Sequence, residues 1–77
     1  MDRQLVIANV KHLRTQREWT QDALAERVGV TPGYIGLIER GERYAKLEVW
    51  SAIADALGVD LETLTKVDLT HSDQVAA

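Results

Sequence analysis

Glycine residues divide this chain into short stretches, and that division limits the secondary structure it can form. Gly29, Gly41 and Gly58 each follow a stretch in which apolar residues recur three and four positions apart, the spacing of an amphipathic α-helix. Because glycine accepts the left-handed backbone conformation in which many helices end, each of the three is expected just beyond a helix C-terminus. The pattern predicts an all-α fold built from short helices.

Five helical segments are predicted from the apolar spacing. The fourth is the clearest, and its apolar stripe consists of Trp50, Ile53, Ala54 and Leu57. Three of the other segments begin with residues that are good N-caps, namely Thr20, Thr31 and Asp60. The segments are expected at about residues 5–17, 20–28, 31–40, 47–57 and 60–66.

The length of 77 residues allows one domain without room for both a core and a deep substrate cavity. The chain has no cysteine, and its two histidines, His12 and His71, lie far apart with no acidic pair at ligand spacing. No metal, cofactor or small-molecule substrate is therefore expected. The chain also lacks an HExxH motif, a phosphate-binding glycine loop after a strand and a Ser/His/Asp set, so an enzyme is not expected.

Charge is distributed unevenly along the chain. The net charge of −3 argues against a nucleic-acid ligand. However, residues 1–46 hold eight of the nine Lys and Arg residues and six of the twelve Asp and Glu residues, which gives this part a net charge of +2. Residues 47–77 have a net charge of −5. Because phosphate binding depends on local potential, the first part can face DNA while the second faces away. Ordinary solvated charge on an acidic protein is the alternative interpretation.

Residues 20–41 predict two short helices joined by a very short connection. Each helix begins at a threonine, and only Gly29 and Val30 separate the first helix from the threonine of the second. Such a connection forces the helices to cross at a sharp angle, as in a helix-turn-helix. Ile35 and Ile38 are expected to anchor the second helix, which leaves its outer face available for a ligand.

Short motifs through this region and beyond it follow spacings typical of one family. They are Thr20-Gln21, Leu24-Ala25, Gly29-Val30-Thr31, Tyr34-Ile35, Ile38-Glu39-Arg40-Gly41 and Ala56-Leu57-Gly58-Val59. With these motifs, residues 6–64 resemble the lambda-repressor-like family of helix-turn-helix domains, also called the Cro/repressor or xenobiotic-response-element type. The resemblance implies a compact five-helix bundle that binds double-stranded DNA, with the helix at about residues 31–40 in the major groove.

The resemblance also implies the residues that contact DNA. Gln21, at the start of the second helix, is expected to hold a phosphate. The outward positions of the third helix are expected to be Thr31, Pro32, Gly33, Gly36, Leu37 and Arg40. Few of these side chains can form hydrogen bonds with bases, although Thr31 can donate and Leu37 can contact a thymine methyl group. Specificity is therefore expected to rely on Thr31, Tyr34 and the edge from Arg40 to Lys46, together with DNA shape. The alternative is a face that has lost specific readout.

Further contacts are expected in and after the third helix. Arg40 and Arg43 lie where the DNA backbone should pass, and Arg43 can also reach a guanine edge. Tyr34, Tyr44 and Lys46 complete the expected set, although Tyr34 is equally suited to packing in the core. The family commonly has Asn-Pro where this chain has Tyr44-Ala45, which leaves the loop less rigid.

Four residues are expected to be structural because of the family positions they occupy. Arg14 and Glu39 fall at the positions of an ion pair between the first helix and the end of the third. Trp19 and Trp50 fall at apolar positions and are expected in the core rather than as stacking platforms for bases.

The expected protein is a cytoplasmic transcriptional regulator, of repressor type, that binds a palindromic operator as a homodimer. Residues 1–67 are expected to form the DNA-binding domain, and residues 68–77 a polar, frayed tail. No apolar run is long enough for a membrane helix. The alternative is a protein-interaction subunit of antitoxin or antirepressor type with weak DNA binding. The dimer interface is expected at Leu61, Leu64, Val67 and Leu69.

Overall fold

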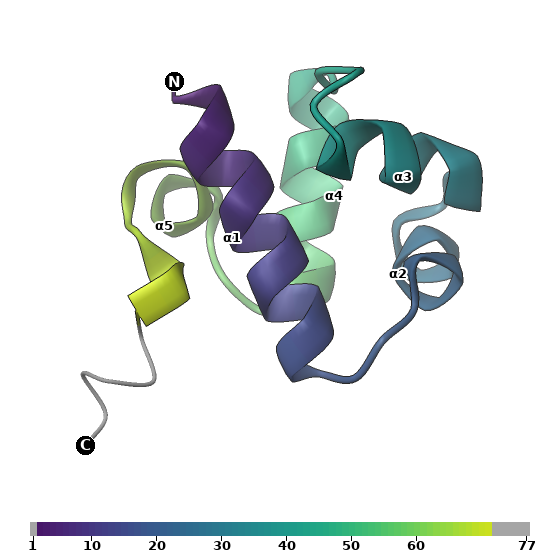
Figure 1. Ribbon diagram of the computed structural model, residues 1–77, viewed down its shortest axis with the longest axis horizontal. Coiled ribbons are helices and arrows are strands. Elements are labelled where there is room, and N and C mark those ends of the chain that lie inside the picture. Colours follow the sequence, from purple (N-terminus) through teal and green to yellow (C-terminus); the bar gives the residue numbers. More distant parts are fainter. Residues whose placement is uncertain (1, 72–77) are drawn as a thin grey trace.

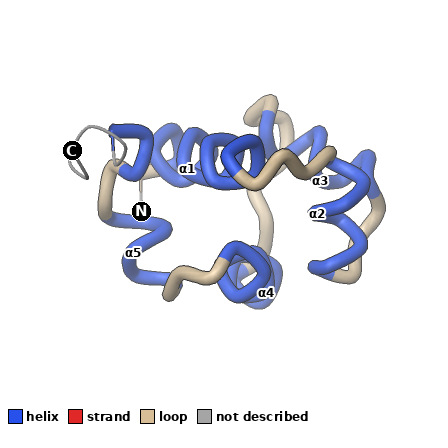
Figure 2. Tube along the Cα trace, turned by 90° about the horizontal axis from the view of Figure 1, so that it is seen from below, coloured by secondary structure: helices blue, strands red, loops and turns tan. Residues whose placement is uncertain are grey.

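Five α-helices follow one another in the computed structural model, which describes residues 2–71. They are α1 (Arg3–Gln16), α2 (Gln21–Val28), α3 (Pro32–Glu39), α4 (Leu47–Leu57) and α5 (Leu61–Lys66), and a 3-10 turn, η1 (Leu69–His71), follows them. Helix α1 lies over α4 and α5, while α2 and α3 pack together at one end (Figure 1, Figure 2). The predicted all-α, five-helix fold is confirmed. None of the described helices is long and apolar enough to cross a membrane.

Helix ends lie where the capping residues predict them. The side chains of Thr20, Thr31 and Asp60 accept hydrogen bonds from backbone N–H groups three residues further on, at 3.0, 3.2 and 2.8 Å. The backbone bond also holds the pKa of the Asp60 carboxyl below its usual value, because it stabilises the charged form. Gly29 and Gly58 end α2 and α4 in the left-handed conformation, with φ of 89° and 79°.

Helix α1 begins two residues before its predicted start. The Asp2 carboxylate accepts a hydrogen bond from the backbone N–H of Leu5 at 3.2 Å and acts as the N-cap. Arg3 is therefore the first residue of the helix, with its side chain exposed to solvent.

All five helices contribute to one hydrophobic core. Its fully buried residues include Val6, Val10, Leu24, Ile35, Ile38, Trp50, Ile53, Leu57 and Leu64. Trp50 is 1% exposed, as expected for a core residue. Trp19 differs because it is only partly buried, and the Cζ atom of Arg27 lies 4.1 Å from the centroid of its ring.

A buried asparagine ties α1 to the end of the described chain. Asn9 is 0% exposed. Its side-chain amide nitrogen donates to the carbonyl oxygens of Leu64 and Val67 at 2.8 and 2.7 Å. Its amide oxygen accepts from the backbone N–H of Leu69 at 2.9 Å. One side chain therefore satisfies three backbone groups where α5 ends and η1 begins.

The predicted dimer interface needs one correction. Leu64 is 0% exposed and belongs to the core, because it lies on the side of α5 that packs against α1 and α4. Leu61 and Leu69 are partly buried against the core, and Val67 is 48% exposed. The predicted frayed tail also begins too early, because residues 69–71 form η1 against α1. The rest of that tail, residues 72–77, lies outside the described residues.

Candidate nucleic-acid interface

The crossing of α2 and α3 places one predicted contact residue out of reach of a ligand. Gly36 is buried, and a Cβ atom there would lie 3.1 Å from Arg40 Nη1 and 3.3 Å from Gln21 Oε1. The prediction that Gly36 faces outward is therefore wrong, because side chains from α2 and from the end of α3 cover it. A side chain at this position would require the ends of the Arg40 and Gln21 side chains to shift by a few tenths of an ångström.

The exposed face of α3 forms an open concavity. Its lining residues are Thr31, Gly33, Tyr34, Leu37 and Arg40. A Cβ atom at Gly33 would meet nothing within 4 Å, so this position presents bare backbone to a ligand. Thr31 Oγ1 accepts the capping hydrogen bond from the Tyr34 N–H, and its hydroxyl proton can still donate. Five of the predicted contact residues therefore line the same concavity.

An ion pair lies beside this face and joins three helices. The Nε and Nη2 atoms of Arg14 donate to the carboxylate of Glu39 at 2.6 and 2.9 Å. Gln21 Nε2 donates to the same carboxylate at 3.1 Å, and Arg14 Nη1 donates to the backbone oxygen of Trp19 at 2.7 Å. The side chains of Arg14 and Glu39 are 11% and 3% exposed. The network fixes the start of α2 against the end of α3.

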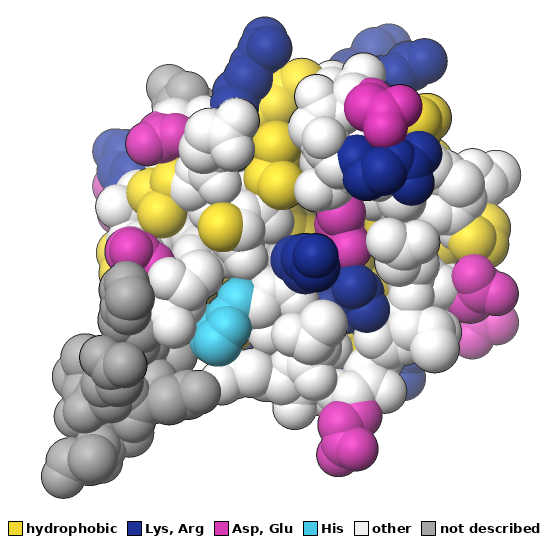
Figure 3. Space-filling model, viewed as in Figure 1, with side chains coloured by type: hydrophobic (Ala, Val, Ile, Leu, Met, Phe, Trp, Pro, Cys, Tyr) yellow, Lys and Arg dark blue, Asp and Glu magenta, His cyan; other side chains and the backbone are white. Residues whose placement is uncertain are grey.

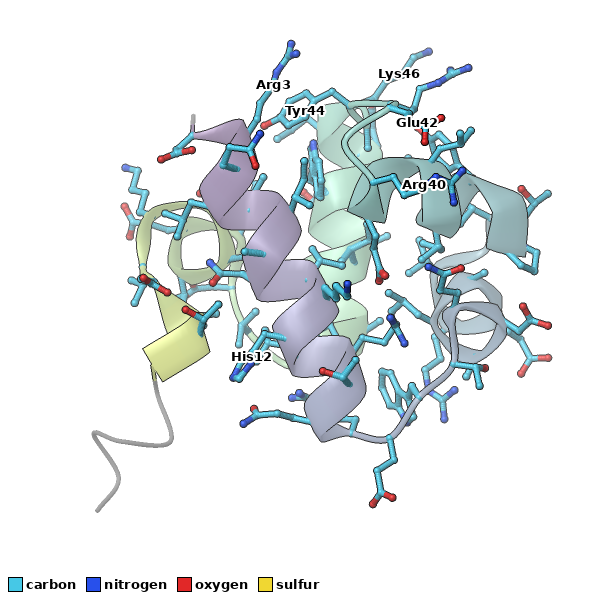
Figure 4. The ribbon with its side chains drawn as sticks, viewed as in Figure 1. Arg3, His12, Arg40, Glu42, Tyr44 and Lys46 are labelled. Carbon is cyan, nitrogen blue, oxygen red and sulfur yellow. The ribbon has the colours of Figure 1, made fainter. Side chains whose placement is uncertain are left out.

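Cations gather in the connection between α3 and α4. Arg40 Nε lies 2.6 Å from Glu42 Oε2, in an ion pair whose two side chains are 57% and 56% exposed. Arg43 and Lys46 are exposed, and within residues 2–71 no carboxylate pairs with either. Figure 4 shows Lys46 at the upper edge of the molecule, with Arg40 below it, directly after the end of α3. The connection therefore carries uncompensated positive charge next to the exposed face of α3.

Both tyrosines of the predicted site are half-buried. Tyr34 lines the concavity and also packs against the core, and the Cζ atom of Arg43 lies 5.9 Å from its ring centroid. The ring of Tyr44 lies 5.1 Å from that of Trp50, at an interplanar angle of 53°. Tyr44 therefore rests on a core residue.

Arg3 lies near the predicted site although no local pattern in the sequence marks it as a contact residue. Its Cζ atom is 4.6 Å from the centroid of the Tyr44 ring. Figure 4 shows Arg3 and Lys46 at the same edge, and Figure 3 shows Lys and Arg side chains there on both sides of a hydrophobic strip. Arg3 and Tyr44 are 41 positions apart in the sequence, so only the packing of α1 brings them together. The predicted dimer residues of α5 lie at the other end of the molecule from α3 (Figure 1).

Comparisons with known proteins agree with this arrangement. The family described as Helix-turn-helix matches residues 10–64. The Uncharacterized HTH-type transcriptional regulator y4dJ of Sinorhizobium fredii (strain NBRC 101917 / NGR234) is 35% identical over 69 residues, which cover 88% of this chain and 90% of that protein. The solution structure of the DNA-binding domain of the P22 C2 repressor is similar, with a TM-score of 0.81 and 31% identity. That match covers 92% of this chain and 93% of the other.

Proposed function

Because the chain belongs to the helix-turn-helix family of DNA-binding transcriptional regulators and has the repressor-like domain, we propose that it is a repressor. It would bind a palindromic operator as a homodimer. The resemblance seen in the sequence is confirmed. The family and the fold are those of transcription regulators and not of enzymes.

The exposed face of α3 is the observation that carries the proposal. Ile35 and Ile38 hold one side of the helix in the core, so Thr31, Gly33 and Leu37 are left at the surface of an open concavity. In helix-turn-helix domains such a face enters the major groove with its N-terminal residues nearest the bases. Leu37 is suited to a thymine methyl group, and the Thr31 hydroxyl to an acceptor on a base or phosphate. The exposed ring of Pro32 lies at the same end of α3.

The phosphate backbone is proposed to pass on either side of α3. On one side Gln21 begins α2, where the backbone N–H groups of the first turn favour an anion. One amide hydrogen of Gln21 is bonded to Glu39, which leaves the second for a phosphate. On the other side Arg43 and Lys46 supply positive charge, and Arg40 can exchange its exposed partner Glu42 for a phosphate.

Dimerisation is proposed because one domain of this size makes few base contacts. Two copies would place their α3 helices about 34 Å apart, one turn of DNA, on a palindromic site. Of the residues expected at the interface, Val67 is the most exposed, and Leu61 and Leu69 keep part of their surface accessible. These three residues, without Leu64, are the proposed contact.

An operator selected from genomic fragments is expected to bind about 10³-fold or more tightly than random duplex at the same salt concentration. The expected stoichiometry is two chains for each operator. Fluorescence anisotropy over a series of salt concentrations measures both quantities. Equal weak binding to every duplex would contradict the proposal. It would favour the alternative of a protein-interaction subunit, for which the net charge of −5 on residues 47–77 suits a basic partner.

Replacing Arg43 by alanine is expected to weaken operator binding by about 1–3 kcal/mol, because a bidentate contact with a guanine contributes about that much. The same change should weaken binding to random duplex less, so the preference for the operator should fall. Lys66→Ala removes the same charge from α5, far from α3 (Figure 1), and is the matched control. A variant that keeps its full preference would show that Arg43 contacts only the DNA backbone.

A further inference from the structure

We propose that Arg3, at the start of α1, is a further DNA-contacting residue and that the Tyr44 ring positions it to bind the phosphate backbone beside Arg43 and Lys46. The inference rests on the proposed DNA-binding function and extends the interface beyond the helix-turn-helix. It also gives Tyr44 a different role from the direct contact that the sequence suggests.

Three side chains form a stack that leads from the core to the surface. Trp50 is 1% exposed and is held by the core. The Tyr44 ring lies on it, with ring centroids 5.1 Å apart, and the guanidinium carbon of Arg3 lies 4.6 Å from the Tyr44 centroid. A flexible arginine at a helix terminus is thus restrained by an aromatic ring that is itself fixed.

This restraint differs from an ion pair because it leaves the charge of Arg3 uncompensated. Arg14, Arg40 and Lys66 each pair with a carboxylate. A ring attracts a cation through its quadrupole and adds no negative charge. Arg3 can therefore stay oriented by Tyr44 and still attract a phosphate.

The position of Arg3 in α1 is unfavourable for the helix alone. It is the first helical residue, and the acid at this end of α1 is the N-cap Asp2, with none in the first turn itself. A helix N-terminus carries partial positive charge, so a cation there is disfavoured and an acid is preferred. The Tyr44 ring offsets part of this cost by stacking on the guanidinium, and a nearby phosphate would offset more of it.

Figure 4 shows where the charge lies. Arg3 and Lys46 point outward from the same edge, and Tyr44 lies between the start of α1 and the connection from α3 to α4. Arg43 is exposed in that connection. The edge therefore holds three cations, from two distant parts of the sequence, beside the face of α3 that is proposed to enter the groove.

The test measures the affinity of the full chain for the selected operator and for random duplex over a series of salt concentrations. Arg3→Ala is expected to weaken the affinity for both duplexes by a similar factor, about 3- to 10-fold at low salt. The plot of log K against log salt should also become less steep by about 0.9, the value for one phosphate contact. Lys66→Ala makes the same change in net charge on α5 and should leave the slope unchanged.

Variants of Tyr44 separate positioning from direct contact. Tyr44→Phe keeps the ring and should retain the wild-type slope, whereas Tyr44→Leu should lower it. Tyr44→Leu should have little further effect when Arg3 is already alanine. Circular dichroism and the melting temperature identify any variant that has lost its fold, and Arg3→Gln then provides a second removal of charge at an exposed position.

Two outcomes would overturn the inference by different routes. If the Arg3→Ala and Arg3→Gln variants show the same slope of log K against log salt as the wild-type chain, Arg3 does not contact phosphate. If the slope falls for Arg3→Ala but Tyr44→Leu has its full effect in the Arg3→Ala background, Tyr44 does not act through Arg3. If the wild-type chain prefers no operator, the proposed function itself fails, and this result is distinct from the other two.

Discussion

Replacing Glu39 by alanine is expected to lower the free energy of unfolding by about 3 kcal/mol, because the change leaves a buried charge without its partner. The side chain of Arg14 is 11% exposed and donates two hydrogen bonds to Glu39. Gln21 loses its acceptor in the same variant. Urea denaturation followed by circular dichroism measures the change, with the slope of the transition compared between variants.

A second, exposed ion pair provides the control. Glu42→Ala breaks the pair with Arg40, whose side chains are both more than half exposed, and should cost less than about 1 kcal/mol. Replacing both Arg14 and Glu39 by methionine should recover much of the stability lost in Glu39→Ala, since no unpaired charge then remains. An unchanged midpoint for Glu39→Ala would show that the pair contributes nothing to stability.

Replacing Asn9 by leucine is expected to cost about 3 kcal/mol of stability. Two carbonyl oxygens, of Leu64 and Val67, and the N–H of Leu69 would lose their partner, and an unsatisfied buried group costs about 1–3 kcal/mol. Hydrogen exchange should show the largest loss of protection in α5, because Asn9 holds its C-terminal end. Urea denaturation measures the total loss in the free energy of unfolding.

Asn9→Asp tests whether the hydrogen bonds cause this effect. An ionised carboxylate would face two carbonyl oxygens, so the variant should be least stable near neutral pH. Burial among acceptors raises the pKa of the introduced carboxyl, and the protonated group can donate one bond. Its stability relative to the native chain should therefore improve as the pH falls through that pKa. A loss independent of pH would point to packing and not to hydrogen bonding.

The helices were largely predictable because their signals are local. A capping side chain and a glycine act within three or four residues, so Thr20, Thr31 and Gly58 give α2, α3 and α4 from the sequence alone. Apolar spacing alone places the start of α1 two residues late, because Asp2 caps the helix ahead of the first apolar residue.

The errors concern residues whose surroundings come from distant parts of the chain. The position of Gly36 on α3 predicts an outward-facing residue, but the Gln21 side chain from α2 covers it. The apolar side chain of Leu64 is predicted at an interface, but α1 and α4 bury it. The partners of Asn9 lie 55 or more residues away in the sequence, so no local pattern marks its role. The DNA contacts themselves remain predictions.

The open surroundings of Gly33 bear on how this regulator can change its target. A Cβ atom added there meets no protein atom within 4 Å, and the position lies in the first turn of α3, where base contacts are made in such domains. Gly33→Asn or Gly33→Arg would therefore add a reader for adenine or guanine without repacking the fold. Gly36, three residues later, is tighter, because a Cβ atom there would displace the ends of the Arg40 and Gln21 side chains. A single substitution at Gly33 is therefore expected to change which operator the protein prefers, while the rest of the fold stays as it is.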